Sequence, residues 1–553
     1  MVAAIDFGTT YSGYAFSTIS DFKQEPLKIS ANQVWNAGQR EHLSLKTPTC
    51  LLLNNKQEIV SFGYEAENGY AELALEERHH DHYFFSRFKM RLYNNKDLTE
   101  DMRLEDLTGK SMLALDVFAL SIKALKKHLL KILKTRGTGV TLHEIKWVLT
   151  VPAIWPDSAK QFMRKSADKA GIDDRNLFIA LEPEAASIYC QYLPTEKLTG
   201  ATKGFTMAGV GQTYMVIDLG GGTADITVHE KLSDGHLKEI CHASGGNCGG
   251  TSVDDAFIKL MIQILGARLI NSLKQKEPSE YLDLLRDFET AKRKVEPTST
   301  GKISFKIPCA TINSLCEAHE CKTLSSMIMS SPFASRVEVK GDKIRIDANI
   351  MRSLFANTIE QIISLVRNVL KKRAARNVQL FLLVGGFADC LLVQNAFKRE
   401  FGNTRIIVPE EAGLSVLKGA VLFGHKSDYI ASRVMRYTYG TNMNYRFDPA
   451  IHDPNRMMVS FGKEYCNGTF SPIMLKNKSV STGTIVKQSY TTSRENQNKT
   501  CIEMYASDKE NVMYIDDESC RKIGEAEVDI PYPSEEERSV SVEYIFGNTE
   551  ISM

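Results

Sequence analysis

The sequence lacks an excess of charge of either sign, and it lacks a long hydrophobic run. Among its 553 residues, 68 lysines and arginines balance 67 aspartates and glutamates, so the formal net charge is +1. This balance argues against the basic surface of a nucleic-acid-binding protein and against electrostatic attachment to a membrane. The most apolar stretch, Met112 to Leu133, is interrupted by Asp116, Lys123, Lys126 and Lys127, so no membrane span is predicted.

Two further signals are missing. No secretory signal is expected, because Met1 runs almost directly into the first motif described below. The 11 cysteines are odd in number and scattered, which indicates reduced thiols, and we therefore expect a cytosolic or nuclear protein. The chain also contains no Gly-x-x-x-x-Gly-Lys-Ser/Thr motif, which argues against a P-loop enzyme.

What the sequence does contain is one short motif in two copies. Residues 6–11 read DFGTTY and residues 218–225 read DLGGGTAD, and each phrase follows an apolar run that predicts a short buried strand. Glycine lets the backbone approach a ligand so that successive N–H groups point at an anion, and threonine adds a hydroxyl donor. An aspartate beside a phosphate implies a bridging cation, most simply Mg²⁺. Two such turns facing each other would hold a polyphosphate from both sides.

The chain divides into an α/β part and a β-rich part. Up to about residue 425, strand-like runs alternate with helical periodicity, and the predicted helices cover Leu113–Leu133, Ser158–Ala170, Ala185–Tyr192, Asp254–Leu273 and Met351–Arg373. After Lys426, turn residues multiply and short alternating runs predict a separate small β domain. The junction from Lys426 to Tyr437 is basic, and we expect it to be irregular.

Short accessory segments follow the two turns in a fixed order: TVPA at 150–153, EPEAA at 182–186, GGT at 249–251, ETAKR at 289–293, and VGG at 384–386 with Gly413 and Gly419 after it. With them, the sequence resembles the actin-like ATPase superfamily and, within it, the seventy-kilodalton heat-shock protein family. The phrases RFKMRL at 87–92 and YTYGTNM at 437–443 make it most similar to the heat shock 70 kDa protein 12 subfamily.

The resemblance implies a fold and a division into domains. Residues 1–427 would form an α/β, two-lobed actin-like ATPase fold of duplicated ribonuclease-H-like domains, with hinges near 182–192 and 413–424. Residues 437–553 would form a small β-rich C-terminal domain.

The resemblance also implies a catalytic set that acts on ATP. Asp6 and Asp218 would hold Mg²⁺ through water and flank the transferred phosphate. Glu182 would orient the attacking water, and Lys89 would place a positive charge near the γ-phosphate. For Lys89 the alternative is an ordinary solvated helix lysine.

The residues implied in binding ATP or ADP are more numerous. They are Gly8, Thr9, Thr10, Tyr11, Gly220, Gly221, Gly222, Thr223, Asp225, Gly249, Gly250, Glu289, Lys292, Arg293, Gly385 and Gly386. The glycines at 385 and 386 would let the backbone lie against the adenosine. The helix face formed by 289, 292 and 293 would line the purine and ribose, although the same spacing is typical of an exposed face with ion pairs.

The sequence departs from the family pattern in four respects. Phe387 and Glu296 stand where serines are usual, which bears on affinity and base preference. The short hydrophobic and acidic linker of the family is missing, and no helical lid follows the β domain. We therefore expect the C-terminal domain to bind something other than an extended peptide, and to respond weakly to the bound nucleotide.

Three hypotheses follow for function. The first is a cytosolic, Mg-ATP-binding protein with slow ATPase activity, whose partners are the nucleotide and an unidentified protein partner or client. The second is a nucleotide-bound scaffold that hardly hydrolyses ATP, which Phe387, Glu296 and the missing linker favour. The third is a small-molecule kinase of the same superfold. Tyr11 and the β-rich ending argue against a kinase, as does the lack of a sugar-binding cluster in the sequence.

Overall fold

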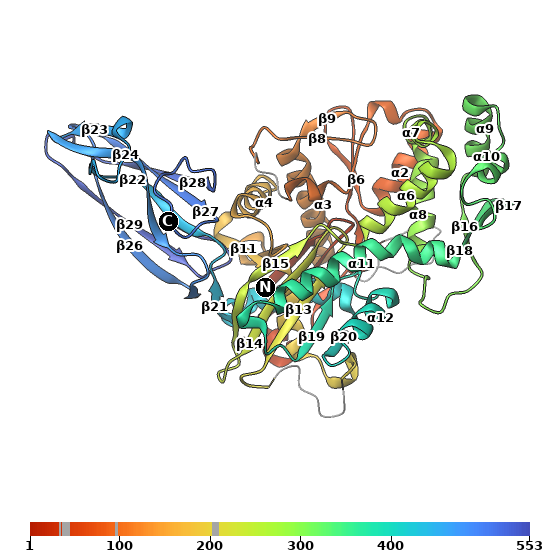
Figure 1. Ribbon diagram of the computed structural model, residues 1–553, viewed down its shortest axis with the longest axis horizontal. Helices are drawn as coiled ribbons and strands as arrows, with labels where there is room; N and C mark the ends of the chain where they lie inside the picture. Colours follow the sequence, from red (N-terminus) through yellow and green to blue (C-terminus); the bar gives the residue numbers. More distant parts are fainter. Residues whose placement is uncertain (33–34, 36–44, 94–97, 202–208) are drawn as a thin grey trace.

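The computed structural model describes residues 1–32, 35, 45–93, 98–201 and 209–553. Figure 1 shows a two-lobed α/β body with a β-rich region projecting from one side. Lobe I is built on a sheet with the strand order β11-β10-β1-β2-β3, in which β4 also pairs with β2. These strands are β1 (Val2–Phe7), β2 (Tyr11–Ser17), β3 (Ser30–Ala31), β4 (Thr47–Pro48), β10 (Lys146–Val151) and β11 (Leu177–Leu181).

Lobe II is built on a larger sheet with the order β12-β20-β19-β13-β14-β15-β21-β25. Its strands are β12 (Leu198–Thr199), β13 (Thr213–Leu219), β14 (Ala224–Lys231), β15 (Leu237–Gly246), β19 (Leu380–Val384), β20 (Arg405–Pro409), β21 (Ile430–Val434) and β25 (Ser479–Ser481).

The two sheets repeat one topology. In lobe I, β1 runs antiparallel to β2 and parallel to β10, which is parallel to β11. In lobe II, β13 runs antiparallel to β14 and parallel to β19, which is parallel to β20. Each duplicated phrase therefore begins at the end of an equivalent central strand. The central strands are buried on both faces, as expected for apolar runs covered by helices.

Most predicted helices are present. The layers around the sheets include α3 (Ala114–Thr135), α4 (Asp157–Lys169), α11 (Ala348–Leu370) and α12 (Leu391–Glu400), whereas α8 (Pro278–Lys292) packs in the outer part of lobe II. The single helix predicted over 254–273 is wrong, because the segment forms α6 (Thr251–Leu265) and α7 (Ala267–Lys276). Gly266 separates them with φ 87° and ψ 148°, a backbone conformation that ends the helix.

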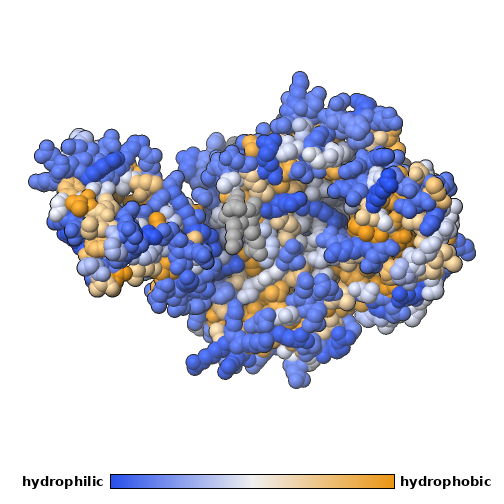
Figure 2. Space-filling view, turned by 45° about the horizontal axis from the view of Figure 1, so that its top comes forward, coloured by the Kyte–Doolittle hydropathy of each residue, from blue (hydrophilic) through white to orange (hydrophobic). Residues whose placement is uncertain are grey.

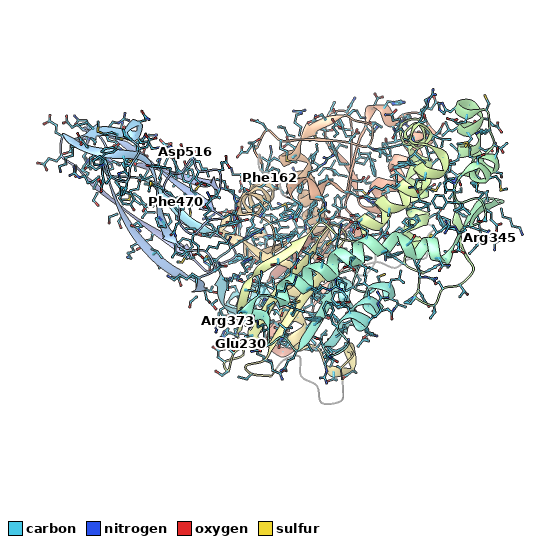
Figure 3. The ribbon with its side chains drawn as sticks, in the orientation of Figure 1. Phe162, Glu230, Arg345, Arg373, Phe470 and Asp516 are labelled. Atoms are coloured by element: carbon cyan, nitrogen blue, oxygen red, sulfur yellow. The ribbon has the colours of Figure 1, made fainter. Side chains whose placement is uncertain are left out.

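Small subdomains extend each lobe. Lobe I carries α1 (Ile19–Gln24), β5 (Cys50–Leu53), β6 (Ile59–Phe62), α2 (Tyr64–Leu75), β7 (Tyr83–Ser86), β8 (Arg103–Glu105) and β9 (Ser111–Leu113). Lobe II carries β16 (Lys302–Lys306), α9 (Cys309–Glu320), α10 (Leu324–Ser330), β17 (Val337–Lys340) and β18 (Lys343–Asp347). In Figure 3, Arg345 marks this far subdomain of lobe II.

Two helices join the lobes. α5 (Glu182–Tyr192) and α13 (Ser415–His425) pack against each other in a core that also includes residues of β1 and β13. Their backbones touch at Gly419, where an added Cβ would lie 1.7 Å from the Ala185 carbonyl oxygen. Both segments predicted as hinges therefore lie together between the lobes, and the hinge motion itself stays a prediction.

The interpretation of residues 426–437 as an irregular junction is wrong. Residues Ile430–Val434 form β21, which pairs with β15 of lobe II and with β25. Ile430 is fully buried, and the side chains of Met435 and Tyr437 are buried as well. The segment thus extends the lobe II sheet, because Ile430 is buried in the core and the buried Arg433 is compensated by Glu184.

The remaining C-terminal strands form two sheets. One has the order β23-β24-β22-β27-β28, and the other pairs β26 with β29. The strands are β22 (Thr438–Arg446), β23 (Met457–Ser460), β24 (Lys463–Met474), β26 (Thr484–Thr491), β27 (Lys499–Ser507), β28 (Cys520–Asp529) and β29 (Ser539–Phe546). Phe470 and Asp516 mark this region in Figure 3, and Phe162 marks α4 of lobe I, in whose core its side chain is buried. Figure 2 shows the region as a narrower, largely hydrophilic projection from the body.

No single helix in the described part of the chain is long and apolar enough to cross a bilayer. α6 and α7 together meet the requirement of length and composition, but they bend by 114° at Gly266.

Candidate functional site

A cavity of about 550 Å³ lies between the lobes and collects most of the predicted site. Among the predicted residues, those that line it are Asp6, Gly8, Thr9, Thr10, Tyr11, Lys89, Glu182, Asp218, Gly220, Gly221, Gly222, Thr223, Glu289, Arg293, Gly385 and Gly386. The predicted residues outside its lining are Asp225, Gly249, Gly250 and Lys292.

The two glycine turns meet across this cavity. A Cβ added at Gly221 would lie 2.3 Å from the Thr10 hydroxyl oxygen, and one at Gly222 would lie 2.6 Å from the Thr9 hydroxyl oxygen. Within the first turn, a Cβ at Gly8 would lie 2.1 Å from the Tyr11 carbonyl oxygen. Only glycine permits these approaches, so the predicted opposition of the two turns is confirmed.

The segment 249–251 supports the second turn from behind. The backbone N–H groups of Gly250, Thr251 and Gly249 donate to the carbonyl oxygens of Gly220, Gly221 and Gly222, at 3.1, 2.8 and 3.1 Å. Because these carbonyls are satisfied there, the turn is held in one conformation. Gly249 and Gly250 therefore act through the turn rather than at the wall of the main cavity.

Asp6 and Asp218 lie at the ends of the equivalent central strands. Asp6 accepts hydrogen bonds from Lys46 Nζ at 2.6 Å and from the Thr150 hydroxyl at 3.0 Å. Gly385 packs so closely on Asp218 that an added Cβ would lie 2.4 Å from its Oδ1. Asp225 is buried beside them and accepts from the Ile154 backbone N–H at 3.0 Å, which makes it a support for the adjoining loop.

Lys89 and Glu182 form an ion pair inside the cleft. The distance from Lys89 Nζ to Glu182 Oε1 is 2.7 Å, and the Lys89 side chain is only 2% exposed. The ammonium also lies 5.1 Å from the ring centroid of the buried Trp155, within the range of a cation–π contact. The reading of Lys89 as a solvated helix lysine is therefore wrong.

The carboxylates of the cleft are held in an unfavourable environment for negative charge. Burial raises the pKa of Glu182 to about 7, with Asp6 and Asp225 adding to the rise and Lys89 opposing it. Burial also raises the pKa of Asp218 well above its usual range, and the neighbouring Glu182, Asp225 and Asp6 reinforce the shift. A cation bound among these groups would relieve their mutual repulsion.

This donor set fits a magnesium–polyphosphate complex. Carboxylate oxygens are the ligands that Mg²⁺ prefers, and it usually keeps several waters alongside one or two carboxylates and substrate phosphates. In the described part of the chain, no cluster of three or more His, Cys, Asp or Glu side chains could hold a metal ion by itself. Asp6 and Asp218 would accordingly hold the ion together with water and phosphate.

A second cavity of about 200 Å³ adjoins the first at the end predicted to hold the base. Lys292 lines it, but its ammonium pairs with Asp254 at 2.6 Å and with Glu289 at 2.5 Å. Arg293 also pairs with Glu289, at 2.8 Å. The helix face of 289, 292 and 293 therefore both lines the cavity and carries the ion pairs of the alternative interpretation.

The two residues that replace the usual serines of the family, Phe387 and Glu296, lie in different places. Phe387 lines the second cavity, and its ring stacks at 16° on that of Phe355, with 6.5 Å between centroids. Glu296 is exposed and lines neither cavity. Phe387 thus changes the shape of the base end, whereas Glu296 has no contact with it.

Sequence reasoning missed Lys46, Trp155 and Asp389. Lys46 lines the cleft from a segment without a motif, and Trp155 reaches Lys89 from the loop after β10. Asp389 lines both cavities, three residues beyond Gly386. Its position three residues after the glycine pair at 385 and 386 was the one signal that could have identified it.

Comparison with known proteins agrees with this geometry. A family model described as Hsp70 protein matches residues 86–324. Heat shock 70 kDa protein 12A of Homo sapiens is 34% identical over 603 residues, which cover 100% of this chain and 88% of that protein. The chain belongs to the Hsp70 family. Among its Hsp70 relatives, heat shock 70 kDa protein 12B of Homo sapiens is 35% identical over 95% of this chain and 83% of that protein.

These relatives confirm the resemblance to the 12 subfamily and the actin-like ATPase fold. A more distant Hsp70 relative, chaperone protein DnaK of Thermotoga neapolitana, is 25% identical over 393 residues. That alignment covers 69% of this chain and 55% of DnaK, so the likeness to DnaK is partial.

Proposed function

We propose that this chain binds a magnesium–nucleoside triphosphate complex, with ATP as the first candidate, and hydrolyses it slowly. The observation that carries the proposal is the meeting of two glycine turns from opposite lobes over Asp6, Asp218 and the buried Lys89–Glu182 pair. Backbone N–H groups of such turns bind phosphate oxygens, and fixed charges stabilise the transition state of phosphoryl transfer.

The proposed roles follow from where each side chain lies. Bound Mg²⁺ would supply charge neutralisation to the phosphates and to the buried carboxylates. Glu182 would hold the attacking water through its carboxylate, whose raised pKa suits a group that accepts a proton. Lys89, whose ammonium contacts Glu182 and the Trp155 ring, would turn from Glu182 toward the terminal phosphate.

We propose a chaperone-like or regulatory role in the cytosol or nucleus, with a protein partner or client still to be identified. The rival proposal is a scaffold that binds the nucleotide without hydrolysing it. The Lys89–Glu182 ion pair supports this rival, because it occupies one oxygen of the carboxylate that would orient the attacking water.

Single-turnover hydrolysis of γ-labelled ATP in the presence of Mg²⁺ decides between these proposals. We expect Glu182→Gln and Asp218→Asn each to slow hydrolysis by roughly 10²-fold, because each removes one positioned charged group. Glu338→Gln is the matched control, since Glu338 pairs with Arg345 in the distant subdomain of lobe II.

ADP affinity and thermal unfolding of each variant should be measured in parallel. Unchanged turnover in both cleft variants would contradict the ATPase proposal. Nucleotide binding without turnover in the wild type would favour the scaffold.

A further inference from the structure

The two aspartates of the phosphate cleft differ in how the chain itself compensates their charge. Both oxygens of Asp6 accept hydrogen bonds, Oδ2 from the Lys46 ammonium at 2.6 Å and Oδ1 from the Thr150 hydroxyl at 3.0 Å. Among the described residues, Asp218 forms neither a hydrogen bond nor an ion pair through its side chain. Asp6 is therefore compensated by the chain, whereas Asp218 has only a bound cation to compensate it.

The surroundings of Lys46 hold it beside Asp6. Lys46 directly precedes β4, whose residues Thr47 and Pro48 pair with β2. Its stem packs on Gly13 of β2, where an added Cβ would lie 3.0 Å from the lysine Cγ. The Lys46 side chain is 17% exposed and the Asp6 side chain is 6% exposed, so water screens their attraction only weakly. Lys46 is therefore a fixed cation of the cleft.

The charge of Lys46 also reaches the second aspartate. Burial raises the pKa of Asp218 well above its usual range, neighbouring carboxylates reinforce the rise, and Lys46 opposes it. A magnesium ion held between Asp6 and Asp218 would carry its charge close to the same ammonium. Two cations at short range repel each other, so each of them reduces the need of the cleft for the other.

We propose that Lys46 is a built-in counter-ion, which takes over at Asp6 part of the charge compensation that Mg²⁺ supplies to a bound nucleotide. Lys46 lines the same cavity as the two glycine turns, and its ammonium has three N–H donors. It can therefore donate to a phosphate oxygen while it stays next to Asp6. With Lys46 in place, the cleft retains a nucleotide at low Mg²⁺ concentration, and the metal is needed mainly at Asp218.

A purely structural role of Lys46 predicts a different result. Its loss would leave Asp6 buried without a cation, and stability would fall whether or not a nucleotide binds. The quantity that separates the two roles is the ratio of the nucleotide dissociation constants without and with Mg²⁺, because only a counter-ion acts on the same phosphates as the metal. This inference rests on the proposed nucleotide binding and adds the residue that sets its dependence on Mg²⁺.

Equilibrium binding of ADP to the full chain, with excess Mg²⁺ or with excess EDTA, measures this ratio. We expect Lys46→Met to raise the ratio about tenfold, within the range typical of coupled sites, because the variant depends on the metal alone. Lys46→Arg keeps the positive charge and should keep the ratio of the wild type. Lys28→Met is the matched control, because Lys28 pairs with Asp21 at the same distance of 2.6 Å but lies outside the lining of the cleft.

Thermal unfolding of each variant shows whether it is folded. Lys46→Gln, which keeps a hydrogen-bond donor beside Asp6, replaces Lys46→Met if that variant does not fold. An equal ratio in the wild type and the neutral variant, or wild-type binding that disappears with EDTA, would overturn this inference and leave the proposed function intact. Failure of the wild type to bind ADP under both conditions would overturn the proposed function and this inference with it.

Discussion

Lys46 is the residue that balances the charge of Asp6 in this cleft. Its ammonium lies 2.6 Å from Asp6 Oδ2, and its side chain is mostly buried in the wall of the cavity. Lys46 also opposes the rise in the pKa of Asp218. A cation at this position lowers the repulsion among the cleft carboxylates, and it could also face the phosphates of a bound nucleotide.

Removing the positive charge of Lys46 should lower the affinity of the cleft for nucleotide. We predict that Lys46→Met lowers nucleoside triphosphate affinity by roughly 10- to 100-fold, since a hydrogen bond to a charged group contributes about 1.5–3 kcal/mol. Titration with a fluorescent nucleotide measures the change. Lys302→Met, which removes a lysine paired with Glu338 far from the cleft, serves as the control. Equal affinities for the wild type and Lys46→Met would refute the prediction.

At the scale of elements, the break between α6 and α7 directs the chain around lobe II. α6 begins at Thr251, the last residue of the 249–251 segment that supports the second turn, and both helices contribute to the large core of lobe II. Gly266 turns the chain by 114° between them. Helical periodicity continues on both sides, so the break depends on the backbone of one residue.

Substitution of Gly266 should therefore lower the free energy of unfolding. We predict that Gly266→Ala destabilises the protein by about 1–3 kcal/mol, because its φ and ψ lie close to a region that only glycine occupies readily. Denaturant unfolding measures the difference. Gly524→Ala is the control, since Gly524 has no positive φ and an added Cβ there would meet nothing within 4 Å. An equal, small effect of both substitutions would show that the break tolerates side chains.

At the scale of the whole molecule, the C-terminal region contacts both lobes. β21 extends the lobe II sheet, whereas the Tyr439 hydroxyl donates to Asp157 of α4 at 2.9 Å. Arg433 on β21 forms a buried bidentate pair with Glu184 of α5, at 2.8 and 2.6 Å. Because α5 begins at Glu182 in the cleft, this arrangement favours stronger coupling to the nucleotide than the sequence predicted.

Breaking the buried pair tests that coupling in the intact chain. We predict that Arg433→Met destabilises the protein by about 3–5 kcal/mol, because it leaves Glu184 buried without its partner. The double variant Glu184→Leu/Arg433→Met should recover much of the loss. Nucleotide affinity in the double variant should differ from wild type by more than about 1 kcal/mol if the regions are coupled.

A double-mutant cycle tests this prediction. It compares the unfolding free energies and nucleotide affinities of the wild type, both single variants and the double variant. An unchanged nucleotide affinity in the folded double variant would support the weak response expected from the sequence.

The two facing glycine turns of the cleft could be predicted from the sequence by itself. Gly8, Gly221 and Gly222 are required by close backbone approaches, and such a requirement appears locally as a glycine-rich phrase. The two copies of the motif also predicted two short buried strands, whereas the duplicated lobes were expected only from the resemblance to the actin-like ATPase superfamily. The two glycine turns were therefore determined by residues close together in the chain.

The ion pairs between residues far apart in the chain were decided only by the tertiary structure. Lys46 meets Asp6 across 40 residues, and Arg433 meets Glu184 across 249 residues. Neither pair has a local pattern, because a surface lysine and a buried one look the same in a sequence. Residues 430–434 of the basic segment form a mostly buried strand, which the sequence did not reveal for the same reason: the partner that compensates the charge of Arg433 belongs to a distant helix, and only folding brings the two together.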